Sequence, residues 1–313
     1  MADSRKVLDQ SSMTVRRSTL KRIGSRRRRH FGLGSLGNIA LTICALYVIA
    51  AIFGPIVLSH RVDLIGSGGS FLRPSGRFWF GTDNLGRDEF SRVVVASRIA
   101  ILVSVESVAF AAIVGTIVGV TAGYFGGLVD EVLSRLMDLL FSVPSYLLGI
   151  VVIVVLGGGL THAALAIGLV FTPQFGRIAR AGTIEVSKRA YIESARLSNR
   201  SSGWIVCRHV IPNIMTPLSV MVGVTLANAE GAYAVLSYLG FGATPPAADY
   251  GSMLSESQQY LTSDPWLVFF PSAALVILIF GFLLLGDWIR DRVDPTARVW
   301  IGGGAVTDVL EGR

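Results

Sequence analysis

Lysine is scarce in this chain of 313 residues. Only Lys6, Lys21 and Lys188 are present, and none of them follows a glycine. A phosphate-binding loop of the form G-x-x-x-x-G-K-[ST] is therefore missing. The chain also has only four histidines and two cysteines, and it contains neither a G-x-S-x-G nor an H-E-x-x-H motif. These absences exclude an ATPase and leave a hydrolase without its usual residues, so we expect no catalytic residue, no metal site and no cofactor.

Charge is scarce as well. Charged residues make up 16% of the chain, hydrophobic residues make up 51%, and the mean hydropathy is +0.58. This composition is far more apolar than that of a soluble domain. Lipid offers no hydrogen-bond partners to the backbone, so apolar windows of ~20 residues predict membrane-spanning helices. We expect an all-α membrane protein with about six of them, over Ile39–Leu58, Ile99–Ala122, Leu136–Leu156, Ala163–Ile178, Ile214–Val235 and Val268–Leu285.

The basic excess is concentrated in residues 1–30, directly before the first apolar window. A basic tail can bind nucleic acid, but this one has no stacking aromatic residues among its charges. The tendency of positive residues to stay on the cytoplasmic side explains it better. We therefore expect no nucleic-acid partner. The first window is longer than the apolar part of a secretory signal, so it is expected to remain as a membrane anchor.

The distribution of Lys and Arg predicts the orientation. Residues 177–208 carry seven of them, whereas residues 236–267 carry none, so the first segment is expected inside and the second outside. Counting the crossings places both termini in the cytoplasm. The segment 59–97 is then external despite its arginines, because long loops follow the charge rule poorly. Cys44 and Cys207 would lie in different environments, and we expect no disulfide between them.

The segment Tyr191–Asn213 carries the most informative pattern. It resembles the EAA loop of ABC-importer permeases, in which Glu-Ala-Ala is followed by three residues, a Gly, and a Pro thirteen residues after that Gly. Here the triplet is Glu193, Ser194 and Ala195, with Asn199 at the glycine position and Pro212 at the proline position. Asn tolerates the left-handed conformation that a helix C-terminal cap requires, so it can replace glycine.

The resemblance implies that this helix–turn–helix is the element that docks on an ATPase subunit. Glu193 would be a polar contact, Ala195 a close-packing point, and Arg208 and His209 part of a charged rim. Ser201 or Ser202 can cap the second short helix. The alternative is an ordinary amphipathic loop. The expected coupling residues are Glu193, Ser194, Ala195, Asn199, Gly203, Arg208, His209 and Pro212.

Further motifs resemble the C-type permease of dipeptide and oligopeptide importers, over about residues 78–295. Phe80-Gly-Thr-Asp-Asn-Leu-Gly-Arg-Asp88 is like the GTDxxGRD signature of that branch. Its acids alternate with Arg87 and Arg92, so an ion-paired external cap is expected here rather than a metal site. The other matching segments are Ala122–Gly127, Leu236–Gly240, Leu285–Asp291 and Asp294–Pro295.

Two acids lie well inside predicted spans, Glu106 and Glu230. An ionisable residue at membrane depth usually faces a cavity or a partner. Both are candidates for the translocation path, and an acid satisfied by a neighbouring helix is an equally good interpretation. Gly115 and Gly119 form a small-xxx-small pair. Such pairs let helices approach closely, and we expect packing within one subunit rather than between subunits.

The resemblance implies a type I ABC-importer permease fold. The expected parts are a basic cytoplasmic tail (1–36), a first span (37–58), an extracytoplasmic loop (59–97), a permease core (98–290) with its coupling loop (187–212), and a cytoplasmic tail (291–313).

The implied function is ATP-driven import of di- and oligopeptides across the bacterial cytoplasmic membrane. The implied partners are a homologous B-type permease, two cytoplasmic ATP-binding subunits, an extracytoplasmic peptide-binding protein and membrane lipid. Import of nickel complexes or glutathione by the same machinery stays open, and so does a non-transporting scaffold. A secondary transporter or channel is a further alternative, although no inverted repeat supports it.

Overall fold

A computed structural model describes residues 33–62 and 69–293 of the chain. The expectations for the two tails therefore lie almost wholly outside the described residues. The chain divides into two units between residues 36 and 37, so α2 is described below from Gly37 onward. The α-helices are α2 (Leu33–Val62), α3 (Glu89–Phe125), α4 (Gly127–Ser142), α5 (Ser145–Leu156), α6 (Leu160–Ser187), α7 (Ala190–Leu197), α8 (Ser202–Ile205), α9 (Ile211–Leu236), α10 (Tyr250–Ser257) and α11 (Trp266–Val293).

Three shorter turns complete the helical structure: π-helical turns at Val206–Val210 and Ser237–Phe241, and a 3₁₀ turn at Gln258–Tyr260. The described residues form no strand, only an isolated bridge between Thr82 and Asp88. The all-α prediction is confirmed. The helix α10 and the π-helical turns were not predicted.

Four helical segments of the described chain are long and apolar enough to span a membrane, or five if the bent pair α4–α5 is one span. The fourth predicted span, Ala163–Ile178, lies in α6, which does not meet this test of length and hydropathy. The physical reason is its position: α6 packs against α3, α4, α5 and α9. Its surface is largely covered by protein, so its sequence can include polar residues such as Thr172 and Gln174.

The predicted span Leu136–Leu156 is not one straight helix. α4 and α5 meet at an angle of 98°. Between them, Val143 is extended (φ −92°, ψ 132°) and is followed by Pro144. The proline ring disfavours the helical conformation of the residue before it, so the helix ends there. The apolar run predicted the segment correctly but not its direction.

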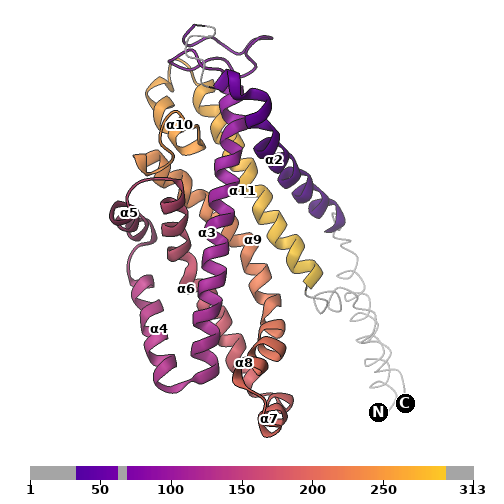
Figure 1. Cartoon of the computed structure of the whole chain (residues 1–313). Helices are drawn as coiled ribbons and strands as arrows, with labels where there is room; N and C mark the ends of the chain where they lie inside the picture. Colours follow the sequence, from indigo (N-terminus) through magenta and orange to yellow (C-terminus); the bar gives the residue numbers. More distant parts are fainter. Residues whose placement is uncertain (1–32, 63–68, 294–313) are drawn as a thin grey trace, which may run out of the picture. The chain divides into compact units, whose positions relative to one another are not determined.

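Glycines on α3 allow it to lie directly against the backbone of α6. A Cβ atom at Gly115 would lie 2.5 Å from the carbonyl oxygen of Thr172, and one at Gly123 would lie 2.7 Å from that of Arg180. At Gly119 a Cβ would overlap the carbonyl oxygen of Gly176. This is packing within one subunit, as the small-xxx-small pair predicted. The two helices run side by side in Figure 1.

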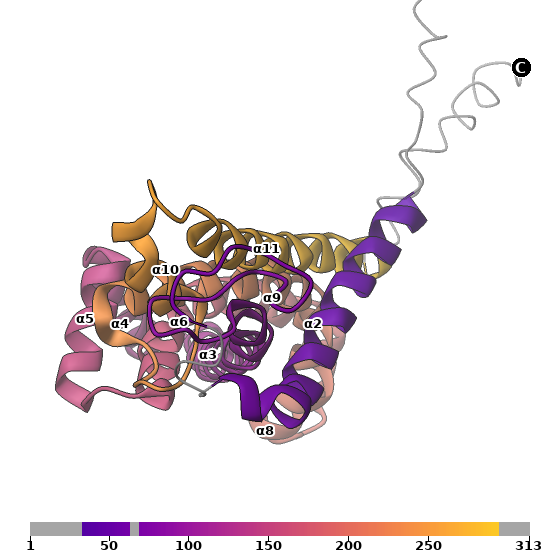
Figure 2. The ribbon, with the colours of Figure 1, turned by 90° about the horizontal axis from the view of Figure 1, so that it is seen from above.

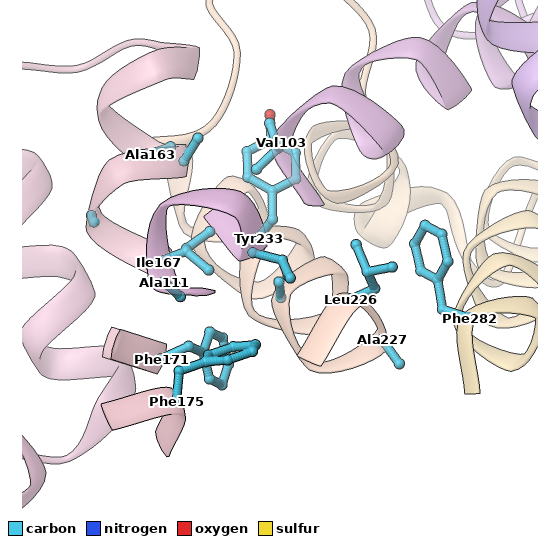
Figure 3. Packing of buried hydrophobic residues seen from close by; sticks show 14 of the residues in the cluster. Val103, Ala111, Ala163, Ile167, Phe171, Phe175, Leu226, Ala227, Tyr233 and Phe282 are labelled. Atoms are coloured by element: carbon cyan, nitrogen blue, oxygen red, sulfur yellow. The ribbon is translucent and has the colours of Figure 1, made fainter. Parts of the chain in front are cut away.

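The core is formed where α3, α6, α9 and α11 meet. Figure 3 shows aromatic rings of α6 and α9 packed among small and branched side chains of the neighbouring helices. In Figure 2, α3, α6 and α9 lie among the other helices. The labelled residues of this core are Val103, Ala111, Ala163, Ile167, Phe171, Phe175, Leu226, Ala227, Tyr233 and Phe282.

The segment of α2 from Gly37 onward is apolar on all sides and mostly exposed within this chain. Only 11% of its most apolar window is buried. It is fixed to α11 by the Tyr47 hydroxyl, which donates a 2.6 Å hydrogen bond to the carbonyl oxygen of Ala274. A helix with no polar face fits a lipid environment or a membrane partner.

The GTDxxGRD segment forms an ion-paired cluster before and within the first turn of α3. The Asp83 carboxylate accepts 2.6 Å hydrogen bonds from both Arg87 Nε and Arg92 Nη1. The other ends of both guanidinium groups reach Glu256 of α10, at 3.1 and 3.0 Å. The ion-paired cap is confirmed, and Glu256 is a member that the sequence did not indicate. Among the described residues, no group of three or more His, Cys, Asp or Glu could hold a metal ion.

We expect Gly119→Ala to weaken the α3–α6 contact, because the new methyl group would overlap the Gly176 carbonyl oxygen. Overpacking of this kind costs about 1–3 kcal/mol. The measurement is the thermal unfolding midpoint of the purified protein in detergent. Gly231→Ala in α9 is the matched control, because its Cβ would meet no atom within 4 Å. Equal midpoints for the two variants would show that the close helix contact is absent.

Candidate functional site

The predicted coupling segment 187–212 forms a compact projection between α6 and α9. In Figure 1, α7 lies beyond α8 at one end of the helices, and α10 lies at the opposite end. Every residue expected to take part in coupling lies in or next to this projection. The element order is α7, a turn, α8, the π-helical turn and the start of α9.

The turn after α7 has the geometry of a Schellman motif. Asn199 adopts a left-handed conformation with φ 57°. Its N–H donates to the carbonyl oxygen of Arg196 (3.0 Å), and the N–H of Arg200 donates to that of Ala195 (3.2 Å). These two bonds satisfy carbonyls that the helix end would otherwise leave free. The predicted role of Asn199 as a left-handed cap is confirmed.

The second short helix starts with a side-chain cap, as expected. The Ser201 hydroxyl accepts a hydrogen bond from the backbone N–H of Trp204 at 3.4 Å. The chain then passes through the π-helical turn into α9, whose first turn contains Pro212. Proline has no N–H to donate. One residue later, the Asn213 side chain donates to the His209 carbonyl oxygen at 2.6 Å. Pro212 thus lies next to the π-helical turn, where the regular α-helical hydrogen-bond pattern is already interrupted.

Three apolar side chains fasten the projection to the rest of the protein. Ile192 of α7, Ile205 of α8 and Val210 of the π-helical turn are fully buried and belong to the hydrophobic core. Ala195 is half-buried and packs against the same core. Burial of a branched aliphatic side chain contributes about 1.5–3 kcal/mol. The loop is therefore an extension of the core rather than a free linker.

An aromatic cluster lies beside these anchors. The His209 ring is 5.1 Å from the Trp204 ring and 5.7 Å from the Tyr191 ring, measured between centroids. The Arg200 guanidinium lies 4.9 Å from the Trp204 ring, within cation–π distance. These contacts join α7, the turn and α8 into one unit. His209, which the sequence assigned to a charged rim, is half-buried at its centre.

The outer surface of the projection is exposed and partly apolar. Leu197 at the end of α7 is 84% exposed, the highest value among the large exposed hydrophobic residues of the described chain. Glu193, Ser194, Gly203 and Arg208 of the projection are exposed as well. Within the described residues, the Glu193 carboxylate has no hydrogen bond or ion pair. Leu197 and the unpaired Glu193 carboxylate thus lie one helical turn apart on the exposed side of α7.

Two contributors were missed by the sequence reasoning. Leu197 follows the motif triplet but has no place in the motif pattern. Tyr124, at the end of α3, is contacted by Arg196 of α7, whose guanidinium lies 5.3 Å from the ring. The only signal for Tyr124 was its position in the matching segment Ala122–Gly127.

The structure does not bring the two deep acids together in one pocket. Glu230 of α9 is buried and accepts a 2.8 Å hydrogen bond from the Ser104 hydroxyl of α3. Glu106 is exposed on another face of α3. The two acids therefore lie in different surroundings, and only Glu230 has a hydrogen-bond partner on a neighbouring helix.

Comparisons with known proteins agree with this architecture. Residues 115–299 match the family described as binding-protein-dependent transport system inner membrane component. The chain is 35% identical to the dipeptide transport system permease protein DppC of Alkalihalophilus pseudofirmus, covering 83% of this chain and 86% of the relative. It is 34% identical to the oligopeptide transport system permease protein OppC of Bacillus subtilis, covering 86% and 88%. It is 36% identical to the glutathione transport system permease protein GsiD of Pectobacterium atrosepticum, covering 71% and 74%.

Solved structures show the same fold at low sequence identity. An inward-facing MetNI methionine ABC transporter matches with a TM-score of 0.55 at 20% identity, over 66% of this chain and 97% of that chain. The membrane helices, the loop geometry and the relatives all agree with the resemblance seen in the sequence. The chain therefore belongs to the family of inner membrane components of binding-protein-dependent transport systems, as a multi-pass permease of the ABC-importer type.

Proposed function

We propose that this chain is the non-catalytic C-type permease subunit of an importer that moves di- and oligopeptides across the bacterial cytoplasmic membrane, driven by separate ATPase subunits. The names of the dipeptide and oligopeptide relatives support the cargo class. The single observation that carries the coupling role is the capped, core-anchored projection at α7–α8 with its exposed outer surface.

The proposed mechanism follows from how this projection is built. Ile192, Ile205 and Val210 are continuous with the core, so a force applied to α7 is transmitted to α6 and α9. Leu197 and Glu193 provide an exposed apolar and an exposed charged contact for an ATPase surface. Ser194 is small and exposed, which permits close approach. Closure of two ATPase subunits on ATP would then shift the membrane helices through a short rigid lever.

The remaining coupling residues support the shape and charge of the projection. Asn199 fixes the turn between α7 and α8, and Gly203 leaves open space beside Trp204. Arg208 is exposed and adds positive charge to the docking surface. His209 holds the aromatic cluster together, and Pro212 marks the transition into α9. Ala195 connects the Schellman turn to the core.

The proposed partners are a homologous B-type permease, two ATP-binding subunits on the cytoplasmic side, and an extracytoplasmic peptide-binding protein. The family description, which refers to binding-protein-dependent transport, supports the last of these. The two permeases would enclose the translocation path at their interface. We propose that both deep acids lie near this interface: Glu106 is exposed on α3, and the buried Glu230 of α9 accepts a hydrogen bond from Ser104 of α3.

Glutathione is the second candidate cargo, because one relative is a glutathione permease of similar identity. A nickel complex is a third candidate. No feature of the described residues favours a secondary transporter or channel over the importer.

Replacing Leu197 by aspartate should uncouple the importer. We expect ATP-dependent uptake of labelled di- to pentapeptides into vesicles to fall at least about tenfold, since loss of ~1.4 kcal/mol of docking energy changes an equilibrium tenfold. The fold should be preserved, because Leu197 is almost fully exposed. The assay uses the assembled transporter with its ATPase subunits, and it also measures ATPase association.

Leu128→Asp is the matched control, since Leu128 is 76% exposed at the start of α4 and lies outside the projection. Uptake by the control should equal that of the native protein. Equal uptake by both variants would contradict the coupling role. Failure of the native assembly to import any peptide, with ATP-dependent import of glutathione or a nickel complex instead, would replace the cargo assignment and leave the coupling role intact.

The left-handed turn gives a second prediction. Asn199→Gly should keep uptake and ATPase coupling, because glycine adopts a positive φ readily. Asn199→Val should reduce coupling, because a branched residue in this conformation costs of order 1–3 kcal/mol. Peptide uptake per ATP hydrolysed is the measurement. Full coupling in the valine variant would show that the capped turn is not needed.

A further inference from the structure

One face of α3 is exposed along much of the helix. The exposed residues recur every three or four positions, so they form a single stripe. They are mainly aliphatic, and Ile113 and Ile117 are each 61% exposed. We call this surface the α3 stripe; it consists of Leu102, Val105, Glu106, Ala109, Ile113 and Ile117.

Glu106 is the one ionisable residue of the α3 stripe, and it lies near the middle of the helix. α3 has 37 residues. At 1.5 Å per residue, Glu106 lies about 26 Å from the residue that begins α3 and about 28 Å from the residue that ends it. The hydrocarbon core of a bilayer is only ~30 Å thick. No charged residue follows Glu106 on α3, and Arg98 lies eight residues before it, so a membrane that begins near Arg98 holds Glu106 about 12 Å inside its hydrocarbon core.

Nothing in the described part of this chain satisfies the Glu106 side chain. Its carboxylate makes no ion pair or hydrogen bond with any described residue. The buried hydroxyl of Ser104 on the same helix is already bonded to Glu230. The nearest basic residue on the exposed face, Arg98, is two helical turns away and cannot reach it.

The exposed faces of α2 and α11 lack such a residue. Between Gly37 and Leu58 of α2, and between Trp266 and Leu285 of α11, there is no Asp, Glu, Lys or Arg. Those faces can contact lipid without cost. The α3 stripe cannot do so at Glu106, because an unpaired acid at membrane depth is expensive and is found against a partner or a cavity.

From this charge mismatch we infer that the α3 stripe is the surface on which a second permease subunit packs, and that a basic or amide side chain of that subunit donates hydrogen bonds to Glu106. The inference rests on the proposed two-permease assembly. The aliphatic residues on both sides of Glu106 supply the close-packed part of the contact. Glu106 makes the contact specific, because a partner helix without a hydrogen-bond donor would leave the Glu106 carboxylate unpaired within the membrane.

Photo-crosslinking in the assembled transporter tests the position of this surface. A photoreactive residue replaces Leu102 or Ala109, and the control replaces Phe280 of α11, which is 58% exposed on a face without charge. The stripe positions should crosslink to the second permease at least about tenfold more than the control, as expected for a packed contact. Crosslinks from the stripe to lipid alone, or to a labelled peptide in transit, would overturn the inference.

Charge variants test the role of Glu106 in the same complex. Glu106→Gln keeps a hydrogen-bonding group, and the amount of co-purified second permease should stay within about threefold of native. Glu106→Lys places a cation against the basic or amide side chain of the second permease. This should lower the amount of co-purified second permease at least about tenfold. Native association of the Lys variant would contradict the pairing.

The two proposals fail differently. If ATP-driven import is found but the stripe does not crosslink, only this inference falls. If no second permease co-purifies with the native chain, the proposed importer assembly falls as well.

Discussion

The close contact between the backbones of α3 and α6 is the constraint on which the rest of the arrangement depends. In lipid the hydrophobic effect does not draw helices together, so close packing must do so. Glycines at positions 115, 119 and 123 bring α3 against the α6 carbonyls over two helical turns. Small side chains on this line are therefore a condition for the fold. The larger core residues fill the space that remains between α6, α9 and α11.

The same contact fixes the functional end of the molecule. α6 leads directly into the α7–α8 projection, and Arg196 of α7 stacks on Tyr124 in the last turn of α3. The projection thus rests on both helices of the close pair. Its buried anchors and its capped turn leave little freedom within it, while Leu197 remains exposed. A rigid lever with an exposed tip is what transmission of a domain movement requires.

The sequence predicted those features that depend on residues close together in the chain. The left-handed Asn199, the Ser201 cap and the ion pairs around Asp83 all follow from residue types at short spacing. Long-range features could not be predicted in this way. The apolar run over α4 and α5 does not indicate the 98° bend between them. Glu256, which pairs with the arginines of the Asp83 cluster, lies far from them in the sequence. Hydropathy predicted a span over Ala163–Ile178, yet α6 does not meet the test of length and hydropathy, because a helix covered by its own protein does not need an apolar surface. The opposite surroundings of the two deep acids likewise depend on which face of each helix the fold covers.

The most direct test of the account is a photoreactive residue at position 197 of the assembled importer. A lever that docks on an ATPase subunit predicts a crosslink from this position to that subunit, and a change in its yield when ATP is bound. Crosslinks only to lipid or to the permeases themselves, with the ATPase subunits present and active, would contradict coupling through this projection.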